Sequence, residues 1–347
     1  MPLGCVANIA DTRYHKLADD LKVLLTSNPS YDDGNYGPVF IRLAWHSSGT
    51  YDPVTKKGGS NGATMRFEPE ASFGANAGLG IPRKVLGDFR DAKHPWVSAS
   101  DLWILASYVY LESSNGPVIP FVPGRVDALP AEVEKLPPDG NLPDAEQGKL
   151  GEDLKSNFAE EQTACIAHIR KIFGRMGFTD REMTCLIIGG HAYGRCHPDR
   201  SGYAGKWISN PVKWGGREYC MLLQEQNMWR IVDGKTPINS SDKVTGVCPF
   251  FDKKTKTGQK QYVDKFNKKM MLFTDMALVW DPEFKKYIDM YAADDVLLKK
   301  DFGEQYKKLT ELGCPFAAGG NKEDTLATML RKISNVCCEV CSGKPTI

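Results

Sequence analysis

Apolar residues recur at every third or fourth position along most of the chain, the spacing that places them on one face of an α-helix. Alternation of single apolar and polar residues, which marks a half-buried strand, is scarce. The pattern therefore predicts an all-α fold of about ten helices with very little β-structure. The ranges with helical spacing are 13–27, 38–49, 100–113, 161–175, 179–192, 216–225, 283–293, 301–312 and 323–335.

Two stretches interrupt the helical pattern. Residues 117–146 are rich in proline, which cannot donate a main-chain hydrogen bond inside a helix, so this stretch is expected to be extended and to separate two helical halves. Residues 230–266 are polar and rich in lysine, and they are predicted to form a surface segment between helices. A helix start is marked at Thr179, because Glu182, three positions on, completes a capping box.

The composition narrows the class of protein. Of the 347 residues, 41% are hydrophobic, which is enough for a sizeable core and excludes wholesale disorder. The 44 lysines and arginines are balanced by 43 acidic residues, so the chain lacks the basic excess of a nucleic-acid-binding protein and no nucleic-acid partner is expected. No run approaches the roughly 18 consecutive apolar residues of a membrane span, so none is predicted.

The N-terminus and the cysteines bear on localisation. The first segment contains Asp11 and no long apolar core, so it resembles neither a secretion signal nor a transit peptide. Most of the ten cysteines are scattered singly, which is typical of a reducing compartment. A soluble intracellular protein is expected, cytoplasmic, or mitochondrial or plastid if a presequence has been removed. The tail cluster Cys337, Cys338 and Cys341 lacks the second pair that a zinc ribbon needs.

The apolar segment 38–50 carries an unusual polar pair. Arg42 and His46 are four residues apart, on the same face of a helix, and Trp45 lies beside them. One interpretation is a core histidine with an arginine paired across the fold, because an unpartnered guanidinium is costly to bury. The other is catalytic: the cation keeps His46 neutral and able to accept a proton, and it polarises a small oxygen substrate.

Two further segments place a single polar residue in an apolar run. His191 follows Gly189 and Gly190 near an expected helix C-terminus. Each helical glycine costs about 1 kcal/mol against alanine, so the pair marks either a fraying end or the close approach of a flat ligand. Asp275, in the run 270–280, is either a residue of a helix N-terminus or a buried carboxylate that accepts the N–H of a metal-ligating histidine.

Five motifs in a fixed order identify a resemblance to a known family. They are R-L-A-W-H-S-S-G-T-Y-D from residue 42, G-A-N-A-G-L at 74–79, G-R-V-D at 124–127 with L-P-D-A at 142–145, G-G-H-A-Y-G at 189–194, and S-G-Y-A-G-K-W at 201–207. In these motifs the chain resembles the intracellular, class I branch of the plant-type haem peroxidases, which contains cytochrome c peroxidase and ascorbate peroxidase. The resemblance extends from about residue 14 to about residue 313.

The resemblance implies two helical lobes with one haem b per chain held non-covalently between them. Residues 1–146 are expected to form the distal lobe and residues 147–300 the proximal lobe. Residues 301–347 are expected to form a C-terminal helix and a Cys-rich tail that pack back on the distal lobe. His191 is implied as the axial ligand of the haem iron, and Asp275 as the acceptor of its Nδ1–H.

On the distal face the resemblance implies an acid–base site. His46 would take a proton from hydrogen peroxide and return it to the departing oxygen, while Arg42 would stabilise the charge that develops. Asn76 would orient His46 through its other ring nitrogen. Trp45 and Pro143 would pack over this face of the haem.

Further residues are implied in haem binding and in electron entry. Trp207 matches the radical tryptophan of cytochrome c peroxidases, and Met270 and Met271 match the soft, polarisable methionine pair beside it. Arg200 matches the arginine that binds ascorbate in ascorbate peroxidases. The residues implied to bind the haem propionates are Arg195, His197 and Ser201.

The chain departs from ascorbate peroxidases at two sites. Gly34 stands where those enzymes have a lysine, which argues against tight ascorbate binding. Their potassium site is expected to be absent, because its hydroxyl and carboxylate ligands are replaced, although Asn210 is kept. The replacing residues are Ala192, Ile208 and Gly215.

Taken together, the resemblance predicts a haem-dependent peroxidase that reduces hydrogen peroxide to water with electrons from ascorbate, ferrocytochrome c or both, in antioxidant defence against oxidative stress. The alternative is a haem-binding peroxide sensor, or an inactive paralogue, on the same fold. The enzyme is favoured because the residues implied in catalysis occur together. They are Arg42, Trp45, His46, Asn76, His191 and Asp275.

Overall fold

The computed structural model describes residues 2–132, 135–145, 154–233, 244–247 and 259–316. Within these ranges the chain is mainly α-helical, so the predicted all-α fold is confirmed. The predicted helix 323–335 and the cysteine cluster of the tail lie outside the described residues. The α-helices are α1 (Thr12–Leu24), α2 (Gly37–Ser48), α3 (Gly80–Lys93), α4 (Ala99–Ser113), α5 (Leu154–Arg175), α6 (Asp180–His191), α7 (Gly216–Gln224), α8 (Phe273–Trp280), α9 (Pro282–Ala293) and α10 (Asp295–Thr310).

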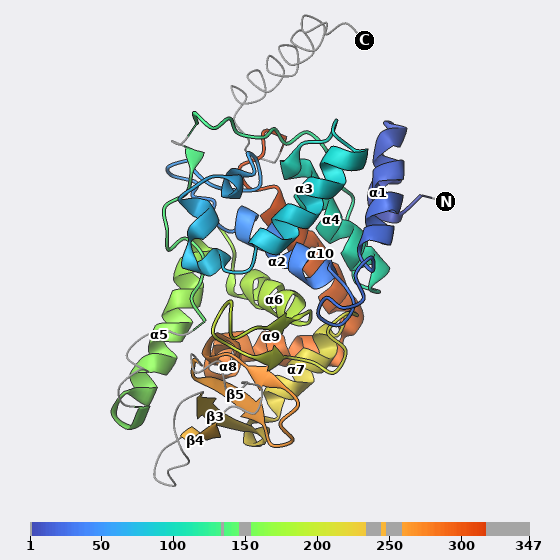
Figure 1. Cartoon of the computed structure of the whole chain (residues 1–347). Helices are drawn as coiled ribbons and strands as arrows, with labels where there is room; N and C mark the ends of the chain where they lie inside the picture. The colour runs from blue at the N-terminus through green and yellow to red at the C-terminus, as the bar shows by residue number, and fades with distance from the viewer. Residues whose placement is uncertain (1, 133–134, 146–153, 234–243, 248–258, 317–347) are drawn as a thin grey trace, which may run out of the picture.

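Helix α10 joins the two halves of the molecule. In Figure 1, α2, α3 and α4 lie in the upper half, whereas α6 to α9 lie in the lower half. Helix α10 packs against both α2 and α6. It runs across residue 301, where the C-terminal segment was expected to begin, and the division into lobes stays a prediction. The described residues of 117–146 contain no α-helix, in agreement with the extended connection predicted there.

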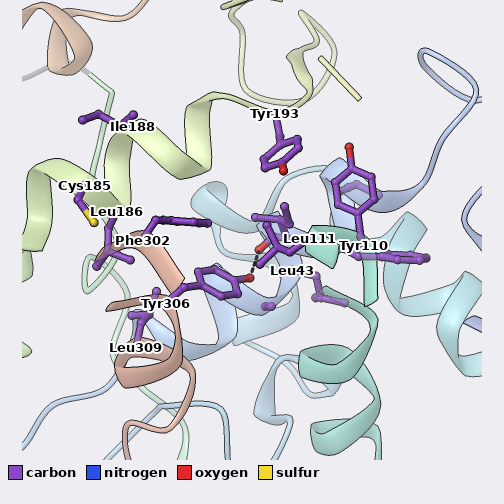
Figure 2. Packing of buried hydrophobic residues seen from close by; sticks show 14 of the residues in the cluster. Leu43, Tyr110, Leu111, Cys185, Leu186, Ile188, Tyr193, Phe302, Tyr306 and Leu309 are labelled. Atoms are coloured by element: carbon purple, nitrogen blue, oxygen red, sulfur yellow. Dashed lines mark hydrogen bonds between the residues drawn. The ribbon is translucent and has the colours of Figure 1, made fainter. Parts of the chain in front are cut away.

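The start and the packing of α6 determine where His191 lies. The predicted capping box is present: the Thr179 hydroxyl accepts the Glu182 N–H, and the Glu182 carboxylate accepts the Thr179 N–H. At the other end, a Cβ on Gly189 would lie 2.2 Å from the Phe302 ring of α10, so only glycine lets the two helices approach this closely. Figure 2 shows Phe302 and Tyr306 beside the residues of α6 in the core.

Short strands complete the fold. Strands β1 (Arg195–Cys196) and β2 (Gly205–Lys206) pair antiparallel. A second sheet has the order β4-β3-β5-β6, formed by β3 (Trp229–Asp233), β4 (Val244–Val247), β5 (Gln261–Asp264) and β6 (Met270–Met271). The prediction of a surface segment over 230–266 is therefore wrong for β5, which is buried at all four positions. Its polar Gln261 is accommodated because the side-chain amide bonds to both the N–H and the C=O of Ala204.

Two helices lie outside the ranges that were predicted from helical spacing. Helix α3 buries Pro82, Leu86 and Phe89, which recur at helical spacing but are separated by many charged residues. Helix α8 is apolar on nearly every side, so it shows no polar face from which a period could be recognised. None of the helices in the described ranges is long and apolar enough to cross a bilayer.

Candidate functional site

The first half of the site pairs the end of α6 with the start of α8. His191 is the last residue of α6, and its Nδ1 lies 2.5 Å from Oδ1 of Asp275, in the first turn of α8. Asp275 is fully buried, whereas the His191 side chain keeps 32% of its surface exposed. With Nδ1 donating to the carboxylate, the lone pair of Nε2 is directed away from it and is available to a metal.

The Asp275 carboxylate gathers four donors. Besides His191, Oδ1 accepts the Tyr219 hydroxyl at 2.5 Å, and Oδ2 accepts Nε1–H of Trp207 at 2.7 Å and the Leu272 N–H at 2.6 Å. Burial alone would raise the pKa of Asp275, but the interaction with His191 and the hydrogen bonds that the carboxylate accepts outweigh burial and lower the pKa. The carboxylate is therefore ionised although it is inaccessible to water.

Trp207 lies directly against His191. The two rings stack with centroids 4.6 Å apart and an interplanar angle of 18°. Trp207 follows β2 and is buried, and its N–H is held by Asp275. Met270 and Met271 form the fully buried strand β6, which ends immediately before Leu272 and α8. The Asp275 carboxylate therefore holds both His191, the candidate axial ligand, and Trp207, the candidate electron relay.

The second half of the site is on α2. The Arg42 guanidinium donates to the main-chain carbonyls of Ala77 at 2.8 Å and Ala75 at 2.9 Å. The interpretation of an arginine paired across the fold is thus correct in that the partners of Arg42 are distant from it in the sequence. Its partners are neutral carbonyls, however, and they leave the positive charge of Arg42 uncompensated.

Asn76, between those two alanines, orients His46. Its Nδ2 donates to the Glu70 carbonyl at 2.8 Å, so its Oδ1 faces Nδ1 of His46 at 3.2 Å. This arrangement assigns the proton of the neutral imidazole to Nδ1 and leaves Nε2 free to accept one. Burial, and then the Arg42 cation, lower the pKa of His46 well below its ordinary value, which the Asn76 contact opposes only in part.

Trp45 and Pro143 are held at the end of α2. The Trp45 ring stacks on Phe173 of α5, with centroids 5.3 Å apart and an interplanar angle of 4°. A Cβ on Gly49 would lie 2.5 Å from the same ring, so glycine is required beneath it. Pro143 is half-buried, and its neighbour Asn141 is tied to this helix end by a bond to the Thr50 carbonyl.

The remaining predicted binding residues lie on the loop after α6 and meet the loop before α2. Arg195 forms a bidentate ion pair with Asp33, at 2.9 and 2.5 Å. His197 Nε2 lies 2.6 Å from Asp32. The Arg200 guanidinium donates to the Tyr31 hydroxyl at 3.2 Å and lies over its ring. Ser201 is exposed. Consecutive residues 31, 32 and 33 thus pair with three of the four residues predicted to bind propionates or ascorbate.

The geometry fits a flat iron cofactor between α2 and α6. The segment just after α6 approaches α2 closely, because a Cβ added to Gly194 would lie 2.9 Å from the ring of Pro38. A Cβ on Gly190, beside His191, would meet no atom within 4 Å. The side chains of His46 and His191 are only partly covered. In each of them Nδ1 is hydrogen-bonded, whereas Nε2 has no hydrogen-bond partner within the part of the chain that the structure describes. Such a set provides one metal ligand and one acid–base group.

Three residues of the site were missed in the sequence. Tyr219 donates to Asp275, Phe173 supports Trp45, and Tyr31 holds Arg200. Each contact joins elements far apart in the chain, so no local spacing marks it. Tyr219 and Phe173 also fit the ordinary pattern of apolar helix positions, and this made them indistinguishable from core residues.

Comparisons with known proteins agree with this geometry. A family model described as Peroxidase matches residues 19–294. The mitochondrial cytochrome c peroxidase of Aspergillus fumigatus is 44% identical over 305 residues, which cover 88% of this chain and 71% of the relative. The corresponding protein of Neurospora crassa is 42% identical over 310 residues, covering 89% and 74%. That of Cryptococcus neoformans is 41% identical over 315 residues, covering 91% and 70%.

The helical fold and the family match define a helical oxidoreductase of the peroxidase class, and the two-histidine site fits a metal cofactor. The chain belongs to the haem peroxidase family, in the class I branch, and has the character of a cytochrome c peroxidase. It is accordingly a haem-dependent peroxidase enzyme.

The lowered pKa of His46 leads to a prediction on pH dependence. A histidine with a depressed pKa in the folded state stays neutral, and hence a proton acceptor, until the pH falls well below its ordinary value of 6.5. In the variant Arg42→Gln the positive charge is removed, so the pKa of His46 should rise. We expect the acid limb of the rate of reaction with peroxide to move toward neutral pH, as measured by rapid mixing of the haem-loaded protein.

The matched control is Arg13→Gln, which removes an exposed cation from α1. Its pH profile should coincide with that of the wild type. An acid limb in Arg42→Gln that stays in place, or moves to lower pH, would contradict the assignment of that limb to His46.

Proposed function

We propose that this chain reduces hydrogen peroxide to water with one non-covalently bound haem b and takes the electrons mainly from ferrocytochrome c. The observation that carries the proposal is the Asp275 carboxylate, which lies 2.5 Å from His191 and 2.7 Å from Nε1 of Trp207. A ligand to iron and an oxidisable indole are thereby held by one buried group. The names of the relatives, cytochrome c peroxidases, support the choice of donor.

The distal residues would carry the proton transfers. Haem, when bound, supplies the iron on which the O–O bond of peroxide is cleaved and the oxidising equivalents are held. Nε2 of His46 accepts the proton of the attacking peroxide oxygen and delivers it to the oxygen that leaves as water. Arg42, fixed by two carbonyls, stabilises the negative charge that develops on that oxygen. Asn76 keeps the proton of His46 on Nδ1, so Nε2 stays a base.

The proximal residues would carry the ligand and the electrons. His191 would bind the iron through Nε2, while Asp275 makes the imidazole a stronger donor by accepting its Nδ1–H. Trp207 would give an electron to the oxidised site and recover one from the donor protein. Met270 and Met271, with polarisable sulfur close to α8 in the chain, would favour a positive charge on the indole. Trp45 and Pro143 would cover the distal face of the haem.

Ascorbate would be a second and weaker donor at Arg200. Its guanidinium is already engaged by Tyr31, and Gly34 replaces the lysine that ascorbate peroxidases have. A charge-assisted hydrogen bond is worth about 1.5–3 kcal/mol, or roughly 10- to 100-fold in rate. Because an ascorbate anion would have to compete with Tyr31 for the Arg200 guanidinium, it would gain only part of this free energy.

The haem propionates would be bound by Arg195, His197 and Ser201 at the loop after α6. Asp33 is paired with Arg195 and Asp32 with His197, so these carboxylates are already engaged and contribute little to an acidic docking surface for a basic cytochrome. The chain would lack the potassium site of ascorbate peroxidases, because Ala192, Ile208 and Gly215 replace its ligands. We propose a mitochondrial role in antioxidant defence, because the relatives are named as mitochondrial proteins.

The experiment is steady-state peroxide turnover of the haem-loaded protein with ferrocytochrome c and with ascorbate, side by side, at low and high salt. We expect a higher kcat/KM with ferrocytochrome c, and a salt dependence confined to that donor, because charged protein surfaces are screened by salt. A kcat/KM for ascorbate above that for ferrocytochrome c would overturn the proposed choice of donor.

A further inference from the structure

Among the side chains that donate to Asp275, Tyr219 is the one that neither the proton chemistry nor the electron route requires. It lies on α7, and its side chain is fully buried. Its hydroxyl donates to Oδ1 of Asp275 at 2.5 Å, and Nδ1 of His191 donates to the same oxygen at 2.5 Å. The rings of Tyr219 and His191 lie edge to face, with centroids 6.4 Å apart.

Two strong donors on one oxygen must share its electron density. A carboxylate offers about four lone-pair directions, and Asp275 uses them on two donors for each oxygen. Every hydrogen bond that Oδ1 accepts withdraws electron density from it and weakens it as an acceptor for the next. The pull that Asp275 exerts on the His191 proton is therefore limited by the hydroxyl of Tyr219.

We infer that Tyr219 is a positioning residue that restrains Asp275 and sets how strongly it draws on the Nδ1–H of His191. The short contact prevents the carboxylate from turning about its own axis, which would take Oδ1 away from His191. Helix α7 thus takes part in the site through a single hydroxyl. Where iron is bound, the same contact moderates the electron donation of the axial ligand, a consequence that rests on the proposed function.

The first test needs no cofactor. In the haem-free protein at neutral pH, the Nδ1 proton of His191 should resonate at low field because of the short contact with Asp275. Tyr219→Phe removes one competitor for Oδ1, so this proton should move further downfield. Site-specific 3-fluorotyrosine at position 219 is a stronger donor of the same shape and should move it upfield. The fluorotyrosine protein keeps the test open if Tyr219→Phe fails to fold.

The second test uses the haem-loaded protein. Tyr219→Phe should raise the stretching frequency of the iron–histidine bond in the ferrous state, measured by resonance Raman, and should lower the ferric/ferrous midpoint potential. The matched control is Tyr291→Phe, which removes another fully buried hydroxyl, 2.8 Å from Asp301 on α10, and should leave both quantities unchanged.

The outcomes separate this inference from the proposed function. Unchanged proton shift, frequency and potential in Tyr219→Phe, or changes opposite to those expected, overturn the role of Tyr219. Failure of the wild type to bind haem refutes the proposed function, while the shift in the haem-free protein still decides the role of Tyr219. A loss of thermal stability alone, shared with Tyr291→Phe, would identify Tyr219 as an ordinary core residue and would overturn the inference.

Discussion

His46→Leu should slow the reaction of the haem-loaded protein with hydrogen peroxide by roughly 10²–10⁴-fold, the usual contribution of a positioned general base. Nε2 of His46 is left free by the bond between Nδ1 and Asn76, and its pKa is lowered by burial and by Arg42, so it is a base over the neutral range. Leucine is similar in volume but cannot accept a proton. The measurement is the bimolecular rate constant under rapid mixing.

The same variant has a clear control. Haem uptake should be unaffected, because the proposed axial ligand is His191 and not His46, and the Soret band of the loaded variant reports this directly. His15→Leu, a histidine on α1, should react with peroxide like the wild type. If His46→Leu binds haem and reacts at the wild-type rate, another group is the base and the distal assignment is wrong.

Trp207→Phe should abolish the turnover of ferrocytochrome c and leave the turnover of ascorbate largely intact. Phenylalanine is far harder to oxidise than tryptophan, and it has no N–H for Asp275 to hold, so the relay beside His191 is lost. Arg200→Asn should do the opposite, with a loss of about 10- to 100-fold in kcat/KM for ascorbate and little change for cytochrome c. Steady-state assays of both variants with both donors measure this.

Trp214→Phe is the matched control for the tryptophan. Trp214 also donates its Nε1–H to a carboxylate, that of Asp295 at 2.8 Å, yet it is not part of the site. Its replacement should spare both activities. Equal loss of both activities in Trp207→Phe and in Arg200→Asn would refute two separate routes and favour a single path through Trp207.

The parts of the site that could be predicted from sequence are those within one element. Arg42 and His46 share a face of α2 because four residues make about one helical turn. Both side chains find their hydrogen-bond partners in the same short segment around Asn76. The start of α6 followed from the capping box at Thr179. The pairing of His191 with Asp275 spans 84 positions and came from the family resemblance alone.

Two local interpretations missed the deciding contact. The glycines before His191 were interpreted as either a fraying helix end or the close approach of a flat ligand, whereas Gly189 is required by the ring of Phe302, and only Gly190 has space beside it. The lysine-rich range 230–266 suggested a surface segment, yet Gln261 is buried because the backbone of Ala204 satisfies its amide. In both cases the deciding partner is distant in the chain, where no periodicity of the sequence records it.

As an enzyme, and not only a haem-binding sensor of peroxide, the haem-loaded chain should complete a full catalytic cycle. The most direct measurement is rapid mixing of the haem-loaded protein with one equivalent of hydrogen peroxide, followed at the Soret band. We predict an immediate change of the Soret band. The starting spectrum should then return as two equivalents of ferrocytochrome c are consumed for each peroxide, since reducing one peroxide to water takes two electrons. A Soret band that changes slowly or not at all would contradict this prediction.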